Sequence, residues 1–159
     1  MSPKSLIIYK SVFHGNTKKV AKVMADVLNA KLSEPHEIGK DHLQEYDLIG
    51  LGSGIYSIKH HKDILNFVDE LPKMKGKKAF IFSTSGLRRI RIFHNFNKHL
   101  EKRLLEKGFD IVGEFSCRGF DNNGLLRLIG GINKGRPNEN DLGRAREFAR
   151  DLKTSLAED

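Results

Sequence analysis

Features typical of secreted and membrane proteins are missing from this sequence. Cys117 is the only cysteine among 159 residues, so no internal disulfide can form and a reducing compartment is expected. No apolar run approaches the roughly 20 residues that span a bilayer. Residues 1–4 lead straight into the first expected strand, which leaves no room for a secretion signal. We therefore expect a cytoplasmic protein with no membrane span.

Patterns for metal binding, covalent catalysis and nucleic-acid binding are also lacking. His60 and His61 are adjacent and His94 and His99 are five apart, so neither pair has the i,i+4 spacing that aligns metal ligands on a helix. Cys117 has no base near it in sequence, which favours a core residue over a nucleophile. No metal site and no catalytic residue are predicted. The formal net charge of +8 favours acidic partners, but the basic residues are dispersed without an RNA- or DNA-binding motif, so nucleic acid is not expected.

Short apolar runs alternate with apolar residues at helical spacing along the whole chain. The expected strands are Leu6–Tyr9, a short edge segment Lys31–Glu37, Tyr46–Gly54, Lys77–Thr84 and Phe109–Cys117. Helices are expected from the first turn to about Ala30, around Ile64–Leu71, around Phe93–Leu104, and from Pro137 to about Leu156. Each helix between two strands returns the chain to the same edge of the sheet, so the strands pair in parallel. The sequence therefore predicts one α/β domain over residues 1–159, with a five-stranded parallel sheet and helices on both faces.

The turn after the first expected strand has the character of a phosphate site. It consists of small and polar residues that feed a helix N-terminus, where backbone N–H groups and the positive end of the helix dipole attract anions. Neither G-x-x-x-x-G-K-[ST] nor G-x-G-x-x-G is present. The alternative is that Asn16 or Thr17 only caps the helix. The length of the turn and its place at the first strand–helix junction favour a site formed by Ser11, Val12, Phe13, His14, Gly15, Asn16 and Thr17.

Three further loops would meet this turn at the carboxyl edge of a parallel sheet. Small residues in them let a ligand approach the backbone, and Tyr56 could lie flat on a planar ring. The alternative for Tyr56 is packing on its own loop, and Phe120 by itself reads more readily as a buried loop anchor. The candidate residues are Ser53, Gly54, Ile55 and Tyr56 in one loop, Thr84, Ser85, Gly86 and Leu87 in the next, and Gly119, Phe120 and Asp121 in the last.

Together these loops resemble those of the flavodoxin family, and the resemblance covers essentially the whole chain. The first strand and turn contain I-Y-x-S followed by G-N-T, Gly52–Tyr56 resembles the second flavin loop, and Phe82–Gly86 resembles the third. The family implies a three-layer sandwich with strand order 2-1-3-4-5 and bound FMN. It further implies that Ser11–Thr17 hold the phosphate, that Tyr56 covers one ring face, and that Ser85–Leu87 bond the pyrimidine side.

The sequence departs from the family pattern in three ways. The first loop is one residue longer than the usual S-x-T-G-N-T and lacks its internal threonine, so the phosphate would depend more on backbone donors, with His14 as an extra one. The third loop lacks the usual tyrosine, so Leu87, Phe93 or Phe120 would cover the second ring face, or it would stay open. The chain is basic where flavodoxins are acidic. Four basic residues beside the expected site would then steer an acidic redox partner, or an arginine would stabilise the reduced flavin; they are Lys59, Arg88, Arg89 and Arg91.

The resemblance implies an FMN-binding electron-transfer protein that shuttles electrons between redox enzymes and turns over no substrate of its own. Two alternatives stay open. One is an FMN-dependent oxidoreductase of the same fold that reduces a quinone or similar acceptor with NAD(P)H. The other is a relative that has lost its flavin and acts as an interaction module.

Overall fold

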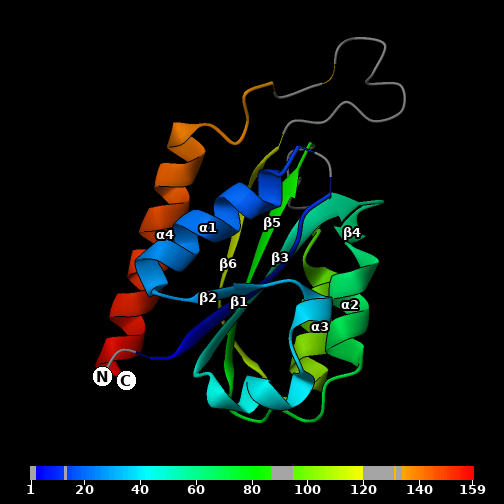
Figure 1. Ribbon diagram of the computed structural model, residues 1–159, viewed down its shortest axis with the longest axis vertical. Coiled ribbons are helices and arrows are strands. Elements are labelled where there is room, and N and C mark those ends of the chain that lie inside the picture. The colour runs from blue at the N-terminus through cyan, green and yellow to red at the C-terminus, as the bar shows by residue number, and fades with distance from the viewer. Residues whose placement is uncertain (1–2, 13, 87–94, 120–130, 132–133) are drawn as a thin grey trace.

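A central parallel sheet lies between two pairs of helices in the computed structural model, which describes residues 3–12, 14–86, 95–119, 131 and 134–159 (Figure 1). The parallel strands are β1 (Ser5–Lys10), β2 (Lys31–Ser33), β3 (Leu48–Tyr56), β5 (Lys78–Ser85) and β6 (Asp110–Arg118). They pair in the order β2-β1-β3-β5-β6. Counted along the chain, this is the predicted order 2-1-3-4-5 of five parallel strands. A two-residue strand, β4 (Lys59–His60), was not predicted and pairs antiparallel with β3.

Helices cover both faces of the sheet, as predicted. α1 (Asn16–Leu28) and α4 (Glu139–Glu158) lie side by side on one face, at the left of Figure 1, and α2 (Lys62–Asp69) and α3 (Lys98–Glu106) lie on the other. Each pair encloses its own apolar cluster against the sheet. None of the helices in the described part of the chain is both long and apolar enough to cross a membrane.

Two glycines of β3 decide how the sheet packs beneath α1 and α4. A Cβ on Gly50 would come within 2.2 Å of the Phe80 ring, and one on Gly52 within 2.5 Å of Phe82. Both phenylalanines are fully buried. The rings of β5 therefore occupy the space that side chains of β3 would otherwise fill.

Two predicted boundaries were wrong. The edge segment expected over Lys31–Glu37 is a strand only to Ser33, because Pro35 starts the short 3₁₀ helix η1 (Pro35–Glu37), which is followed by η2 (Lys40–Glu45). The third helix begins at Lys98 rather than near Phe93, a residue outside the described ranges. Asn97 N donates to the Asn95 side chain at 3.2 Å, and this local turn precedes the helix.

The strand register brings the four candidate loops to one edge. Lys10 of β1 is aligned with Ser53 of β3, and Gly54 of β3 with Thr84 of β5. The last aligned pair of β5 and β6 is Ser85 and Arg118. The loops that follow these strands therefore start beside one another, at the top of Figure 1.

Candidate functional site

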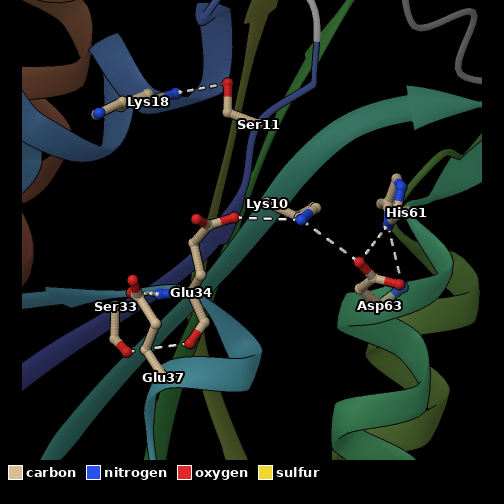
Figure 2. A network of polar contacts seen from close by, with 8 residues as sticks. All are labelled: Lys10, Ser11, Lys18, Ser33, Glu34, Glu37, His61 and Asp63. Atoms are coloured by element: carbon tan, nitrogen blue, oxygen red, sulfur yellow. Dashed lines mark hydrogen bonds and ion pairs between the residues drawn. The ribbon is translucent and has the colours of Figure 1, made fainter.

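The N-cap position of α1 is held by a residue that has no capping side chain. Gly15 is the N-cap residue, with a left-handed φ of 66°, and no cap side chain bonds the helix. The alternative in which Asn16 or Thr17 caps α1 is therefore wrong, because both residues lie inside the helix. Ser11 Oγ accepts a 3.3 Å hydrogen bond from Lys18 N, which joins the end of β1 to the first turn (Figure 2).

The charge around this helix end suits an anion. An acidic side chain in the first turn usually stabilises a helix, because it lies near the positive end of the helix dipole. α1 has no acidic residue in its first turn. Lys18 and Lys19 occupy the turn instead, and both are exposed. His14, also exposed, precedes the cap with a left-handed φ of 43°. A negatively charged ligand would supply the charge that the helix itself lacks.

A buried hydroxyl pair ties the first loop to the third. Thr17 Oγ1 and Thr84 Oγ1 lie 2.9 Å apart, and both residues are buried. Because Thr17 is buried with its hydroxyl against Thr84, we expect backbone groups of this turn rather than the Thr17 hydroxyl to reach a ligand.

Gly119, at the start of the fourth loop, contacts both the first loop and the third. Gly119 N donates to Ser85 O at 3.0 Å. A Cβ on Gly119 would come within 2.6 Å of the Asn16 side-chain amide, so a larger residue here would require that side chain to move. The structure thus brings together the described parts of three predicted loops. The remaining predicted residues lie outside the described ranges: Phe13, Leu87, Arg88, Arg89, Arg91, Phe120 and Asp121.

The second loop is a hairpin rather than an open loop. β3 continues through Gly54 and Ile55 to Tyr56 because β4 pairs with its end, and Ser57 and Ile58 turn the chain with left-handed φ values of 48° and 66°. Ile58 at the tip is 51% exposed.

Tyr56 is half-buried against its own hairpin. Its ring meets the edge of the His61 ring, with centroids 5.3 Å apart and planes at 84°. Its hydroxyl lies over Gly54, where a Cβ would come within 2.9 Å of the oxygen. Tyr56 therefore packs on its own loop, and its contact with one face of a flavin ring stays a prediction. Lys59, predicted as a docking residue, is exposed on β4 beside it.

A buried polar chain beneath the hairpin was missed by sequence reasoning. His60 Nδ1 lies 2.9 Å from Ser53 Oγ, and His60 Nε2 lies 2.8 Å from Asn97 Oδ1. All three residues are at most 1% exposed. Burial lowers the pKa of His60 to about 4, against a smaller opposing effect of the Asn97 hydrogen bond. No local pattern could have found this chain, because Asn97 is 37 positions from His60.

A second polar network joins β1 to the neighbouring turns (Figure 2). Lys10 Nζ lies 3.2 Å from Glu34 Oε1 and 3.5 Å from Asp63 Oδ2, and the hydrogen bond to Glu34 raises the pKa of Lys10. His61 Nδ1 accepts from Asp63 N at 3.1 Å and so caps α2, while burial lowers the pKa of His61. The positive charge of Lys10 is therefore paired with two carboxylates of the protein itself.

A group of potential metal ligands lies at the start of η1. Ligand atoms of Glu34, His36 and Glu37 come within 4.8 Å of one another. Both carboxylates already act in the capping box of η1, and Glu34 also bonds Lys10. The group is explained by these local contacts.

Comparison with known proteins agrees with this architecture. The family description "Flavodoxin domain" matches residues 6–116. An uncharacterized protein of Methanocaldococcus jannaschii is 48% identical over 149 residues, which cover 94% of this chain and 97% of that protein.

Solved structures show the same fold at low sequence identity. A flavodoxin from the domain Archaea superposes with a TM-score of 0.71 at 18% identity, covering 97% of this chain and 99% of the other. Oxidised flavodoxin 2 from Bacillus cereus gives a TM-score of 0.66 at 24% identity, covering 92% and 94%. The family match spans most of the strands and helices described above, and we conclude that this chain belongs to the flavodoxin family.

Proposed function

We propose that this protein binds FMN without a covalent bond and transfers electrons between redox enzymes. The observation that carries the proposal is the N-terminus of α1, which has a glycine cap, no acidic residue in its first turn, and exposed Lys18 and Lys19. Family membership adds the expectation of a flavin. When bound, FMN supplies the electron-accepting and electron-donating ring.

The proposed phosphate contacts come mainly from the backbone. The turn from Ser11 to Thr17 would surround the phosphate with N–H groups at the positive end of the α1 dipole. The Ser11 hydroxyl holds Lys18 N at 3.3 Å, so it shapes the turn. The absence of an acidic residue means that no carboxylate competes with the phosphate there.

The proposed ring site lies over the ends of β3, β5 and β6. Gly54, Ser85, Gly86 and Gly119 would let the ring approach the backbone, and Tyr56 would contact one ring face. The other predicted residues of these loops, Ser53, Ile55, Thr84, Leu87, Phe120 and Asp121, stay part of the proposed site. None of these groups forms or breaks a bond. Their role is to bind and orient the ring and to limit its contact with water.

The Ser53 hydroxyl and the Cys117 thiol are unsuited to act as nucleophiles, and electron transfer through a bound flavin requires neither. Ser53 is fully buried, and its Oγ accepts from His61 N at 2.8 Å and lies 2.9 Å from His60 Nδ1. Burial raises the pKa of the Cys117 thiol to about 12, so the thiolate does not form at neutral pH.

We propose that exposed Lys59, together with Arg88, Arg89 and Arg91, steers a redox partner with an acidic surface.

The test compares two flavins and two matched variants. Titration of the purified protein, followed by flavin fluorescence, should show that FMN binds more tightly than riboflavin, which lacks the phosphate. Lys18→Glu should weaken FMN binding, because reversing one charge near a doubly charged group is worth roughly 1–2 kcal/mol, or about five- to thirtyfold in Kd. Lys22→Glu makes the same change one helical turn further away and should have an effect of less than about twofold. Riboflavin binding should be unchanged in both.

Other results would contradict the proposal. Equal effects of Lys18→Glu and Lys22→Glu on FMN would place the phosphate elsewhere. A preparation that binds neither flavin at micromolar concentration would indicate an interaction module instead. Steady consumption of NAD(P)H by the flavin-loaded protein without a partner would indicate an oxidoreductase.

A further inference from the structure

The polar chain of Ser53, His60 and Asn97 connects three elements around the proposed ring site. Ser53 is the residue of β3 directly before the hairpin, and its Oγ also accepts from His61 N at 2.8 Å, at the start of α2. His60 lies on β4, which pairs with Ile55 of β3. Asn97 is the N-cap residue of α3. The chain therefore fixes the base of the hairpin to the beginning of two helices.

This arrangement is unfavourable for stability alone. His60 is a buried imidazole at 1% exposure. Asn97 occupies an N-cap position but gives its side chain to His60 and makes no cap hydrogen bond to α3. Within the described residues, Asn97 Nδ2 is also buried without a hydrogen-bond partner. Apolar side chains of similar size would fill this space at lower cost, so the polar chain is better explained by the geometry that it imposes.

The geometry that it imposes concerns the hairpin. The turn at Ser57 and Ile58 adopts two left-handed conformations in succession, which is unfavourable for a β-branched residue such as Ile58. Such a turn persists only where neighbouring contacts hold both of its ends. The two-residue pairing of β4 supplies part of that support, and the bond from His60 to Asn97 anchors β4 to α3.

We propose that His60 and Asn97 are positioning residues that hold the Gly54–Tyr56 segment in place against the flavin ring. The inference rests on the proposed function, since it assigns a role toward the ring of FMN. Neither residue is exposed enough to touch the flavin, so both act through the hairpin. Their effect should fall on the ring and leave the phosphate contacts at α1 unchanged.

The experiment uses His60→Phe, which keeps a ring of similar shape but cannot hydrogen-bond, and Asn97→Ala, which removes the other end of the same bond. His99→Gln is the matched control, because His99 is exposed on α3 two residues from Asn97. FMN and riboflavin binding, the midpoint potential of the bound flavin, and amide hydrogen exchange over residues 54–59 of the flavin-free protein are measured for each variant.

The positioning role predicts parallel losses. Both flavins should bind about tenfold more weakly to His60→Phe and to Asn97→Ala, which is the size expected for one buried hydrogen bond. The double variant should bind no more weakly than His60→Phe alone, because His60→Phe already lacks the bond to Asn97 as well as the bond to Ser53. Exchange over residues 54–59 should rise, and the midpoint potential should shift, while His99→Gln matches the unmodified protein in every measurement.

Contrary results separate the two levels of the proposal. Folded variants that bind both flavins with unchanged affinity and potential would overturn the positioning role and leave the proposed function standing. Loss of FMN binding with riboflavin unaffected would also overturn it, because the effect would then lie at the phosphate. If Asn97→Ala does not fold, the chain is a folding element and the positioning role fails. An unmodified protein that binds neither flavin would overturn the proposed function and this inference together.

Discussion

The burial of His60 predicts that the protein loses stability in mildly acidic solution. In the unfolded chain His60 accepts a proton near its ordinary pKa of 6.5, whereas in the folded protein burial lowers the pKa to about 4. Between these values the unfolded state binds more protons than the folded state. Unfolding is therefore favoured as the pH falls, and the contribution of neutral His60 is complete only above about pH 6.5.

The size of this effect follows from the two pKa values. A change from 6.5 to about 4 corresponds to about 3 kcal/mol, of which about 2.5 kcal/mol should be lost between pH 7.5 and 4.5. Urea unfolding followed by circular dichroism at several pH values measures this loss directly. The titration should be reversible, because only the protonation state of the protein changes.

Other groups titrate nearby and need a control. Burial lowers the pKa of His61 as well, which acts in the same direction. The pKa of Asp141 is lowered by its hydrogen bonds to arginine against the effect of burial, and its contribution is lost mainly below this window. His60→Phe keeps both of these groups. Between pH 7.5 and 4.5 its free energy of unfolding should therefore fall by about 2.5 kcal/mol less than that of the unmodified protein. The same pH dependence in His60→Phe and in the unmodified protein would refute the reasoning.

Two further predictions concern the scaffold. Gly50→Ala places a Cβ 2.2 Å from the fully buried Phe80 ring and should lower the free energy of unfolding by at least about 2 kcal/mol. Gly143→Ala, in open space within α4, should raise the free energy of unfolding by up to about 1 kcal/mol. Equal effects of the two variants in thermal unfolding would contradict the packing described for β3 and β5. Asp141 is buried and accepts from Arg136, so Asp141→Ala should cost about 3 kcal/mol in urea unfolding, against less than about 1 kcal/mol for Arg146→Ala at an exposed ion pair. A cost below about 1 kcal/mol for Asp141→Ala would show that the buried carboxylate is dispensable.

Local periodicity was enough to predict the architecture. The buried runs around Ile7, Leu51 and Ile81 are apolar over several consecutive residues, and each is followed by residues at helical spacing. Boundaries were less well predicted where a single side chain intervenes, as Pro35 does after β2 and Asn95 does before α3. The two-residue strand β4 has too few residues to produce a periodic signal.

The sequence also predicted which loops lie together at one edge of the sheet, but not how their residues contact one another. Parallel strands bring the loops after them to one edge whatever the side chains are, so Thr17, Thr84 and Gly119 had to come close together. That Thr17 bonds Thr84 instead of facing outward, and that Tyr56 lies against His61, depends on contacts between loops far apart in the chain.

The sequence by itself determined the succession of strands and helices along the chain, their parallel pairing and the edge at which the loops gather, because each of these follows from patterns a few residues long. Only the tertiary structure decided that Gly15 is the N-cap residue of α1, that Lys10 forms ion pairs with Glu34 and Asp63, and that His60 is buried between Ser53 and Asn97. Burial and pairing depend on which distant segments meet, and the free energy of a polar side chain depends on that surrounding rather than on its sequence neighbours.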